Sequence, residues 1–169
     1  RVKKGHADLL RAAKLVLRRF PEVHFVIAGD GPQMQNLLRL IGELGLESRV
    51  HMLGLRRDVT NVLQSLDLFA LPTHQEALGT AFVEAGAVGL PVVATNVDGV
   101  PEVVAQGETG VLVSPGDPAA LAEAISGFLE DPVRRRQFGD NARRHVARDF
   151  SCEVMARRME ELYTGLLEN

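Results

Sequence analysis

Short apolar runs alternate along this chain with segments in which apolar residues recur at helical spacing. The run at 23–28 is nearly continuous in apolar residues, as expected of a strand that is buried on both faces. It lies between segments 6–19 and 34–44, where apolar residues mark one face of a helix. Strands that alternate with such helices predict repeated βαβ units, and therefore a parallel sheet covered on both sides.

The same alternation continues through residue 113. Further strands are predicted at 50–53, 68–71, 91–95 and 109–113, and further helices at about 59–66 and 79–88. Glycine and proline punctuate several of these boundaries, as is typical of turns. The predicted fold class is therefore α/β, with a Rossmann-like, doubly wound parallel sheet.

Three helices are predicted to complete the chain. Asp117 and Asp131 each precede a proline, which suits a helix with a capping acid and a proline at its first position. Ser151 is the predicted cap of the third helix. We expect one apolar face of that helix to be buried; it consists of Met155, Met159, Leu162 and Leu166.

The beginning of the sequence does not match a complete doubly wound sheet, in which the first strand is usually central. The chain opens with a loop and a helix instead. We therefore expect a single Rossmann-like domain of 169 residues that lacks its first strand. Residues 1–150 would form the α/β core and residues 151–169 a C-terminal helix.

Composition argues against several classes of function. The net charge of −3 is too small to imply nucleic acid as a partner, and no apolar run approaches the roughly 18 residues of a membrane span. Cys152 is the only cysteine, which suits a reducing, cytoplasmic setting. The histidines show no metal-binding spacing, so no metal site is predicted. The arginines at 134–136 and 143–144 indicate solvated helix faces, with contact to another domain or a membrane surface as the alternative.

Ligands of open parallel sheets bind beyond the carboxyl ends of the strands. The segment 72–84 leads from a strand into a helix, and free N–H groups at Gly79 and Thr80 would favour a phosphate there. Glu76 and Glu84 could flank one ligand, since carboxylates accept hydrogen bonds from sugar hydroxyls. His74 lies near Glu76 and is a further candidate contact.

Several motifs follow one another in this region. They comprise Glu76, Gly79 and Glu84, the run Gly89–Thr95, and then Gly99 and Pro101-Glu102. Together they resemble the signature of glycosyltransferase family 4, a group of retaining enzymes with the two-domain GT-B fold. The resemblance extends over nearly the whole chain, through Lys4-Gly5-His6, Gly29–Pro32, Leu53-Gly54, Asp67–Pro72 and Gly107–Gly110.

The resemblance implies that the chain is the C-terminal, donor-binding half of a GT-B fold. Glu76 would contact a hydroxyl of the donor sugar, and Glu84 the ribose hydroxyls of the nucleotide. Backbone N–H groups near Leu78, Gly79 and Thr80 would hold the sugar and the diphosphate.

Lys4 and Arg1 would neutralise the diphosphate, whose charge grows as the glycosidic bond breaks. Lys4 and Glu76 are therefore the predicted catalytic residues. Gly31 belongs to the glycine-rich loop that follows the strand at 23–28, and it is a predicted ligand contact at the same edge of the sheet.

Two positions depart from the family pattern. Ala77 replaces the first glycine of the E-G-x-G motif and adds a methyl group where backbone should approach the sugar. Asp98 replaces the first glycine of a G-G pair and puts an acid near a predicted anionic ligand, which weakens binding unless its carboxylate points away. Both departures bear on whether the site is active.

The expected function is donor binding in a retaining glycosyltransferase that uses a nucleotide-diphosphate sugar and no cofactor. An N-terminal domain outside this sequence would bind the acceptor, so the isolated chain would be inactive. One alternative is a non-catalytic nucleotide-sugar binding module. Another is a sugar-nucleotide epimerase of GT-B fold, with His74 and Glu76 as its acid and base. A dinucleotide-binding motif is disfavoured because Met34 stands where a third glycine is required.

Overall fold

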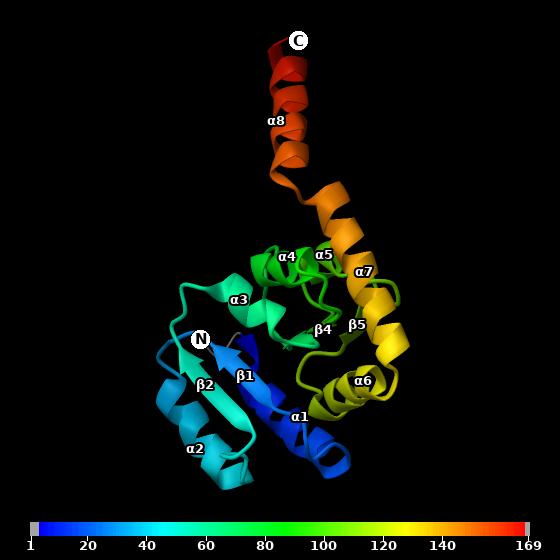
Figure 1. Ribbon diagram of the computed structural model, residues 1–169. Helices are drawn as coiled ribbons and strands as arrows, with labels where there is room; N and C mark the ends of the chain where they lie inside the picture. Colours follow the sequence, from blue (N-terminus) through cyan, green and yellow to red (C-terminus); the bar gives the residue numbers. More distant parts are fainter. Residues whose placement is uncertain (1–3, 168–169) are drawn as a thin grey trace.

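The computed structural model describes residues 4–167, in which strands and helices alternate as the sequence predicts (Figure 1). The strands are β1 (Phe25–Ala28), β2 (Val50–Gly54), β3 (Phe69–Leu71), β4 (Val92–Thr95) and β5 (Gly110–Val113). The helices are α1 (His6–Arg19), α2 (Met34–Leu44), α3 (Val59–Gln64), α4 (Thr80–Ala87), α5 (Val100–Val103), α6 (Pro118–Glu130), α7 (Pro132–Asp149) and α8 (Cys152–Leu167). The predicted α/β fold class is confirmed.

Every strand pair in this part of the chain is parallel, and the strands form two groups. β1 pairs with β2, and β4 lies between β3 and β5. Within residues 4–167, β1 and β3 are not paired with each other. These are the two groups that a doubly wound order places on either side of a central strand.

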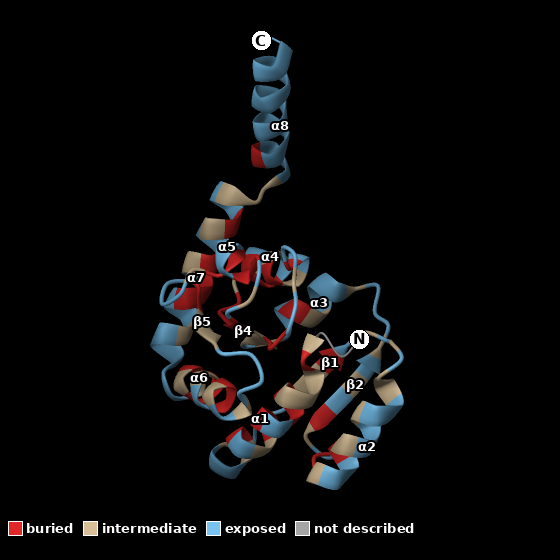
Figure 2. Ribbon diagram, turned by 180° about the vertical axis from the view of Figure 1, so that it is seen from behind, coloured by how far each residue is buried: buried red, intermediate tan, exposed pale blue. Residues whose placement is uncertain are grey.

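The hydrophobic core has two layers, and the alternating residues of β4 divide them. Val93 is fully buried in the cluster formed with α1, α2 and α6. Val92 and Ala94 belong to the other cluster, with residues of α3, α4 and α5. Because successive side chains of a strand point to opposite faces, both faces of the sheet are covered. Figure 2 shows that buried residues gather in the main body of the molecule, whereas most of α8 is exposed.

The predicted caps of the last three helices are confirmed. Asp117 accepts a hydrogen bond from the backbone N–H of Ala120 at 2.9 Å. Asp131 accepts two, at 3.1 and 2.9 Å, from the first turn of α7. The Ser151 hydroxyl accepts from the backbone N–H of Val154 at 3.3 Å. Each cap therefore satisfies N–H groups that the helix itself leaves unpaired.

The predicted burial of one face of α8 is wrong. Its apolar residues are between 46% and 66% exposed; they are Met155, Met159, Leu162 and Leu166. The helix projects from the body of the domain (Figure 1), and only Val154 at its start is buried. The apolar spacing thus correctly predicted a helix, but within residues 4–167 nothing covers that face. None of the described helices is long and apolar enough to cross a bilayer.

Candidate functional site

The loop that follows β3 lies against the residues at the start of α1. Gly5 has a φ of +65°, and a Cβ there would lie 1.7 Å from the carbonyl oxygen of Pro72. Any side chain would therefore clash with backbone, and only glycine tolerates this approach and this φ without strain. The contact brings the beginning of the chain to the carboxyl edge of the sheet, where the predicted site lies.

This approach places the two predicted catalytic residues in contact. The Lys4 Nζ atom forms a short ion pair with Oε2 of Glu76. The Glu76 side chain is only 14% exposed, whereas that of Lys4 is 39% exposed. The pair thus joins a largely enclosed carboxylate to a cation that solvent still reaches. Arg1, the other predicted cation, lies outside the described residues.

A second pair joins the same two segments. Nε2 of His74 lies 2.7 Å from Oδ2 of Asp8, which belongs to the first turn of α1. The Asp8 side chain is 14% exposed, and its Oδ1 also accepts a hydrogen bond from Arg11 at 3.2 Å. His74 is a contact predicted from the sequence, whereas Asp8 is not. The only sequence signal at Asp8 is an acid in the first turn of a helix, which is an ordinary stabilising feature.

The loop at 96–99 holds the Glu76 backbone from the other side. Oδ2 of Asp98 accepts a hydrogen bond of 3.0 Å from the backbone N–H of Glu76, and the N–H of Gly99 donates to the Glu76 carbonyl at 3.2 Å. Asp98 adopts a φ of 43°, a region that aspartate tolerates better than most residues. The Asp98 carboxylate therefore has a partner inside the protein. Ala77, the other departure from the family pattern, is exposed.

Helix α4 begins at Thr80, with Gly79 at its cap position, and no side chain caps this start. Leu78 and Thr80 are exposed beside it. An uncapped helix start presents backbone N–H groups and the positive end of the helix dipole, both of which favour an anion. Glu84 is exposed further along the same helix.

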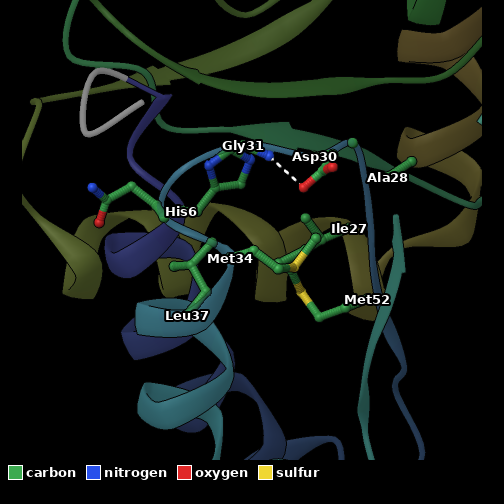
Figure 3. A pocket seen from close by; sticks show the side chains of 10 residues that line it. His6, Ile27, Ala28, Asp30, Gly31, Met34, Leu37 and Met52 are labelled. Atoms are coloured by element: carbon green, nitrogen blue, oxygen red, sulfur yellow. Dashed lines mark hydrogen bonds between the residues drawn. The ribbon is translucent and has the colours of Figure 1, made fainter. Parts of the chain in front are cut away.

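The loop after β1 forms a small hollow at the same edge of the sheet. Figure 3 shows it between α1, α2 and β2, with His6, Gly31, Met34 and Met52 among its lining residues. Its volume of about 70 Å³ is well below the roughly 300 Å³ at which small-molecule pockets begin. The N–H of Gly31 already donates to Oδ1 of Asp30 at 2.7 Å.

His6 is half-buried in this hollow, and burial lowers its pKa because the charged ring is poorly solvated there. The positive charge of Lys4 lowers it further. His6 therefore faces the hollow as a neutral ring at neutral pH. In the described part of the chain, no three His, Cys, Asp or Glu side chains are grouped so as to hold a metal ion.

A larger hollow of about 360 Å³ lies at the opposite edge of the sheet. Lys14, Arg18 and Arg49 contribute positive charge to its lining. It lies beyond the amino ends of β1 and β2, whereas ligands of open parallel sheets bind at the carboxyl ends. None of the predicted site residues that the structure describes belongs to it.

The fold and the site together define a class of protein. A parallel α/β domain with a lysine, a glutamate and an uncapped helix start at the carboxyl edge of its sheet is built like a nucleotide-binding domain. The model of the family described as "Glycosyl transferases group 1" matches residues 1–145, and the chain belongs to that family.

Individual relatives agree with this assignment. The chain is 33% identical to the N-acetyl-alpha-D-glucosaminyl L-malate synthase of Bacillus anthracis, over 96% of this chain and 42% of the relative. It is 37% identical to the D-inositol 3-phosphate glycosyltransferase of Corynebacterium diphtheriae, over 95% of this chain and 39% of the relative. The chain thus spans less than half the length of these relatives.

A solved structure, that of HepE from Anabaena in complex with UDP-glucose, superimposes on the chain with a TM-score of 0.91 and 30% identity. The match covers 98% of this chain and 46% of HepE. The superposition therefore confirms the prediction that this chain has the fold of one half of a GT-B glycosyltransferase.

Proposed function

We propose that this chain is the donor-binding domain of a retaining glycosyltransferase that transfers a sugar from a nucleoside-diphosphate sugar to an acceptor. The observation that carries the proposal is the contact between Lys4 and Glu76 beside the uncapped start of α4. A cation, a carboxylate and free N–H donors are the groups that a diphosphate and a sugar hydroxyl require.

Each group has a distinct part in the proposed reaction. The N–H groups at the start of α4 bind the diphosphate, and Lys4 neutralises the charge that develops on it as the glycosidic bond breaks. Glu76 accepts a hydrogen bond from a hydroxyl of the donor sugar, and Glu84 from the ribose. Retention of configuration and independence from any metal or other cofactor follow from the resemblance to family 4, with Lys4 supplying the positive charge.

Two observations support a working site. Asp98 directs its carboxylate to the Glu76 backbone, so it holds Glu76 in place instead of presenting a negative charge to the diphosphate. UDP and UDP-glucose complexes of HepE support a nucleoside-diphosphate sugar as the ligand class.

The acceptor is proposed to bind to a second, N-terminal domain of the whole protein. The chain accounts for only about 40% of the length of its curated relatives, which leaves room for such a domain. The exposed apolar face of α8, defined by Met155, Met159, Leu162 and Leu166, is the surface of this chain best suited to pack against it. Closure of the two domains would exclude water and align the reactants.

Titration of UDP, GDP and ADP into isotope-labelled protein, followed by amide NMR, tests donor binding. One nucleotide should shift the amide signals of Lys4 and of residues 76–84. K4M and E84Q should weaken binding by about tenfold or more, whereas K14M and E43Q, which alter similar side chains elsewhere, should not. A folded protein that binds none of the three nucleotides would refute the proposal.

Product analysis with the full-length protein separates the alternatives. Transfer with retention gives an acceptor glycoside whose anomeric configuration matches that of the donor sugar. An epimerase would instead convert one nucleotide sugar into its epimer without an acceptor. Donor binding with neither product would indicate a non-catalytic binding module.

A further inference from the structure

The pair formed by Asp8 and His74 has no part in the mechanism proposed above. His74 lies in the loop that also carries Glu76, and its side chain is 42% exposed, so it is accessible from solvent. Asp8 is largely enclosed and holds Nε2 of His74 at 2.7 Å. Among residues 4–167, no hydrogen bond is found for Nδ1, the other ring nitrogen.

The chemistry of the carboxylate determines which nitrogen carries the proton. An ionised carboxylate only accepts hydrogen bonds, so Nε2 must be the protonated, donating atom. A neutral imidazole carries one N–H, which leaves Nδ1 with a lone pair and no proton. Nδ1 is then an acceptor, and it suits a hydroxyl group rather than an anionic phosphate oxygen.

The next step rests on the proposed function. We propose that Nδ1 of His74 accepts a hydrogen bond from a hydroxyl of the donor sugar. Asp8 is then the positioning residue that fixes the tautomer and the orientation of the His74 ring. The segment 72–76 supports this placement, because its contacts with Gly5 and Lys4 hold it at the carboxyl edge of the sheet. The pair thus contributes to recognition of the sugar and not of the nucleotide.

The test compares the affinities of the full-length protein for UDP and for UDP-glucose, measured by calorimetry. UDP contains the base, the ribose and the diphosphate, so the ratio of the two dissociation constants gives the contribution of the sugar to binding. H74Q retains an amide that can donate to Asp8 but has no acceptor at the position of Nδ1. H74N retains an acceptor close to Nδ1 but does not reach Asp8. D8N replaces the carboxylate with an amide that can donate as well as accept, so the tautomer of His74 is no longer fixed.

We expect H74Q to lose about five- to tenfold in affinity for UDP-glucose, the size of one net hydrogen bond, with UDP affinity within about twofold of wild type. D8N should show a smaller loss of the same kind, and H74N should retain more sugar-dependent affinity than H74Q. D67N and H24Q, which alter an acid and a histidine away from this loop, should match wild type.

A wild-type protein that binds UDP, but binds UDP-glucose no more tightly, would overturn the inference. An H74Q protein with the wild-type affinity ratio would overturn it as well. Equal losses for UDP and UDP-glucose would mean that His74 merely supports the fold of the loop. Failure of the wild-type protein to bind any of UDP, GDP and ADP would count against the proposed function itself, so the two failures are distinguishable.

Discussion

Gly99→Ala is the most direct test of how the loops around Glu76 are held together. The φ of Gly99 is −82°, which alanine adopts freely, so the substitution introduces no backbone strain. An added Cβ would, however, lie 1.8 Å from the carbonyl oxygen of Ala77. Because such contacts are not found below 3.0 Å, the two loops must separate by at least 1.2 Å.

This separation should affect stability and binding together. Overpacking of this kind costs about 1–3 kcal/mol of unfolding free energy. It also lengthens the 3.2 Å hydrogen bond from Gly99 to the Glu76 carbonyl and moves Glu76 away from Lys4. Since a misplacement of about 1 Å can cost on the order of 10²-fold in rate, we expect sugar transfer by the full-length protein to fall by a similar factor.

Urea unfolding, UDP-glucose calorimetry and a sugar-transfer assay with the full-length protein measure these effects. Gly127→Ala is the matched control, because Gly127 lies in α6 and its added Cβ would come no closer than 3.7 Å to a neighbouring side chain. That substitution should leave binding unchanged and should preserve or raise stability, by up to about 1 kcal/mol, through better helix propensity. A G99A protein with a wild-type urea midpoint and a wild-type rate of sugar transfer would refute the inferred close packing of these loops.

Three further results are expected. Burial lowers the pKa of His6 in the folded protein, so its neutral ring contributes stability above the unfolded pKa of about 6.5, and this stability is lost as the pH falls through the lowered folded pKa. H6Q should therefore flatten the decline of the unfolding free energy below about pH 6.5. D131A should cost about 1–2 kcal/mol in urea unfolding, because two N–H groups of α7 lose their cap; an unchanged midpoint would contradict this. L162E should alter the unfolding free energy of the isolated chain by less than about 0.5 kcal/mol, and a larger loss would mean that α8 is covered in solution.

The positions of the strands and longer helices could be predicted because local periodicity determines them. Four of the strands β1 to β5 lie within a predicted apolar run, and β2 extends one residue beyond its run, to Gly54. The acids at 117 and 131 cap their helices as expected. Helix α5 was not predicted, because four residues are too few to show a helical period. The burial of α8 was predicted wrongly, because periodicity identifies an apolar face but not what covers it.

The candidate site was only partly predictable. Motif order indicated Lys4 and Glu76 separately, but their contact depends on how α1 docks against the loop after β3. The contacts of Asp8 with His74 and of Asp98 with Glu76 also join segments distant in sequence. Such pairs follow from the placement of whole elements, so no local pattern in the sequence identifies them.

The ion pair between Lys4 and Glu76 joins positions 72 residues apart in the chain. Closing a loop of that length costs roughly 4 kcal/mol in chain entropy, whereas a partly exposed ion pair contributes about 1 kcal/mol or less. The ion pair therefore does not form in the unfolded chain, and it exists only in molecules whose whole α/β core has folded. A nucleotide that binds there must stabilise the native state, by about 2.7 kcal/mol at a hundredfold excess over its dissociation constant. A thermal-shift screen of nucleotides can thus identify the donor class before any acceptor is known.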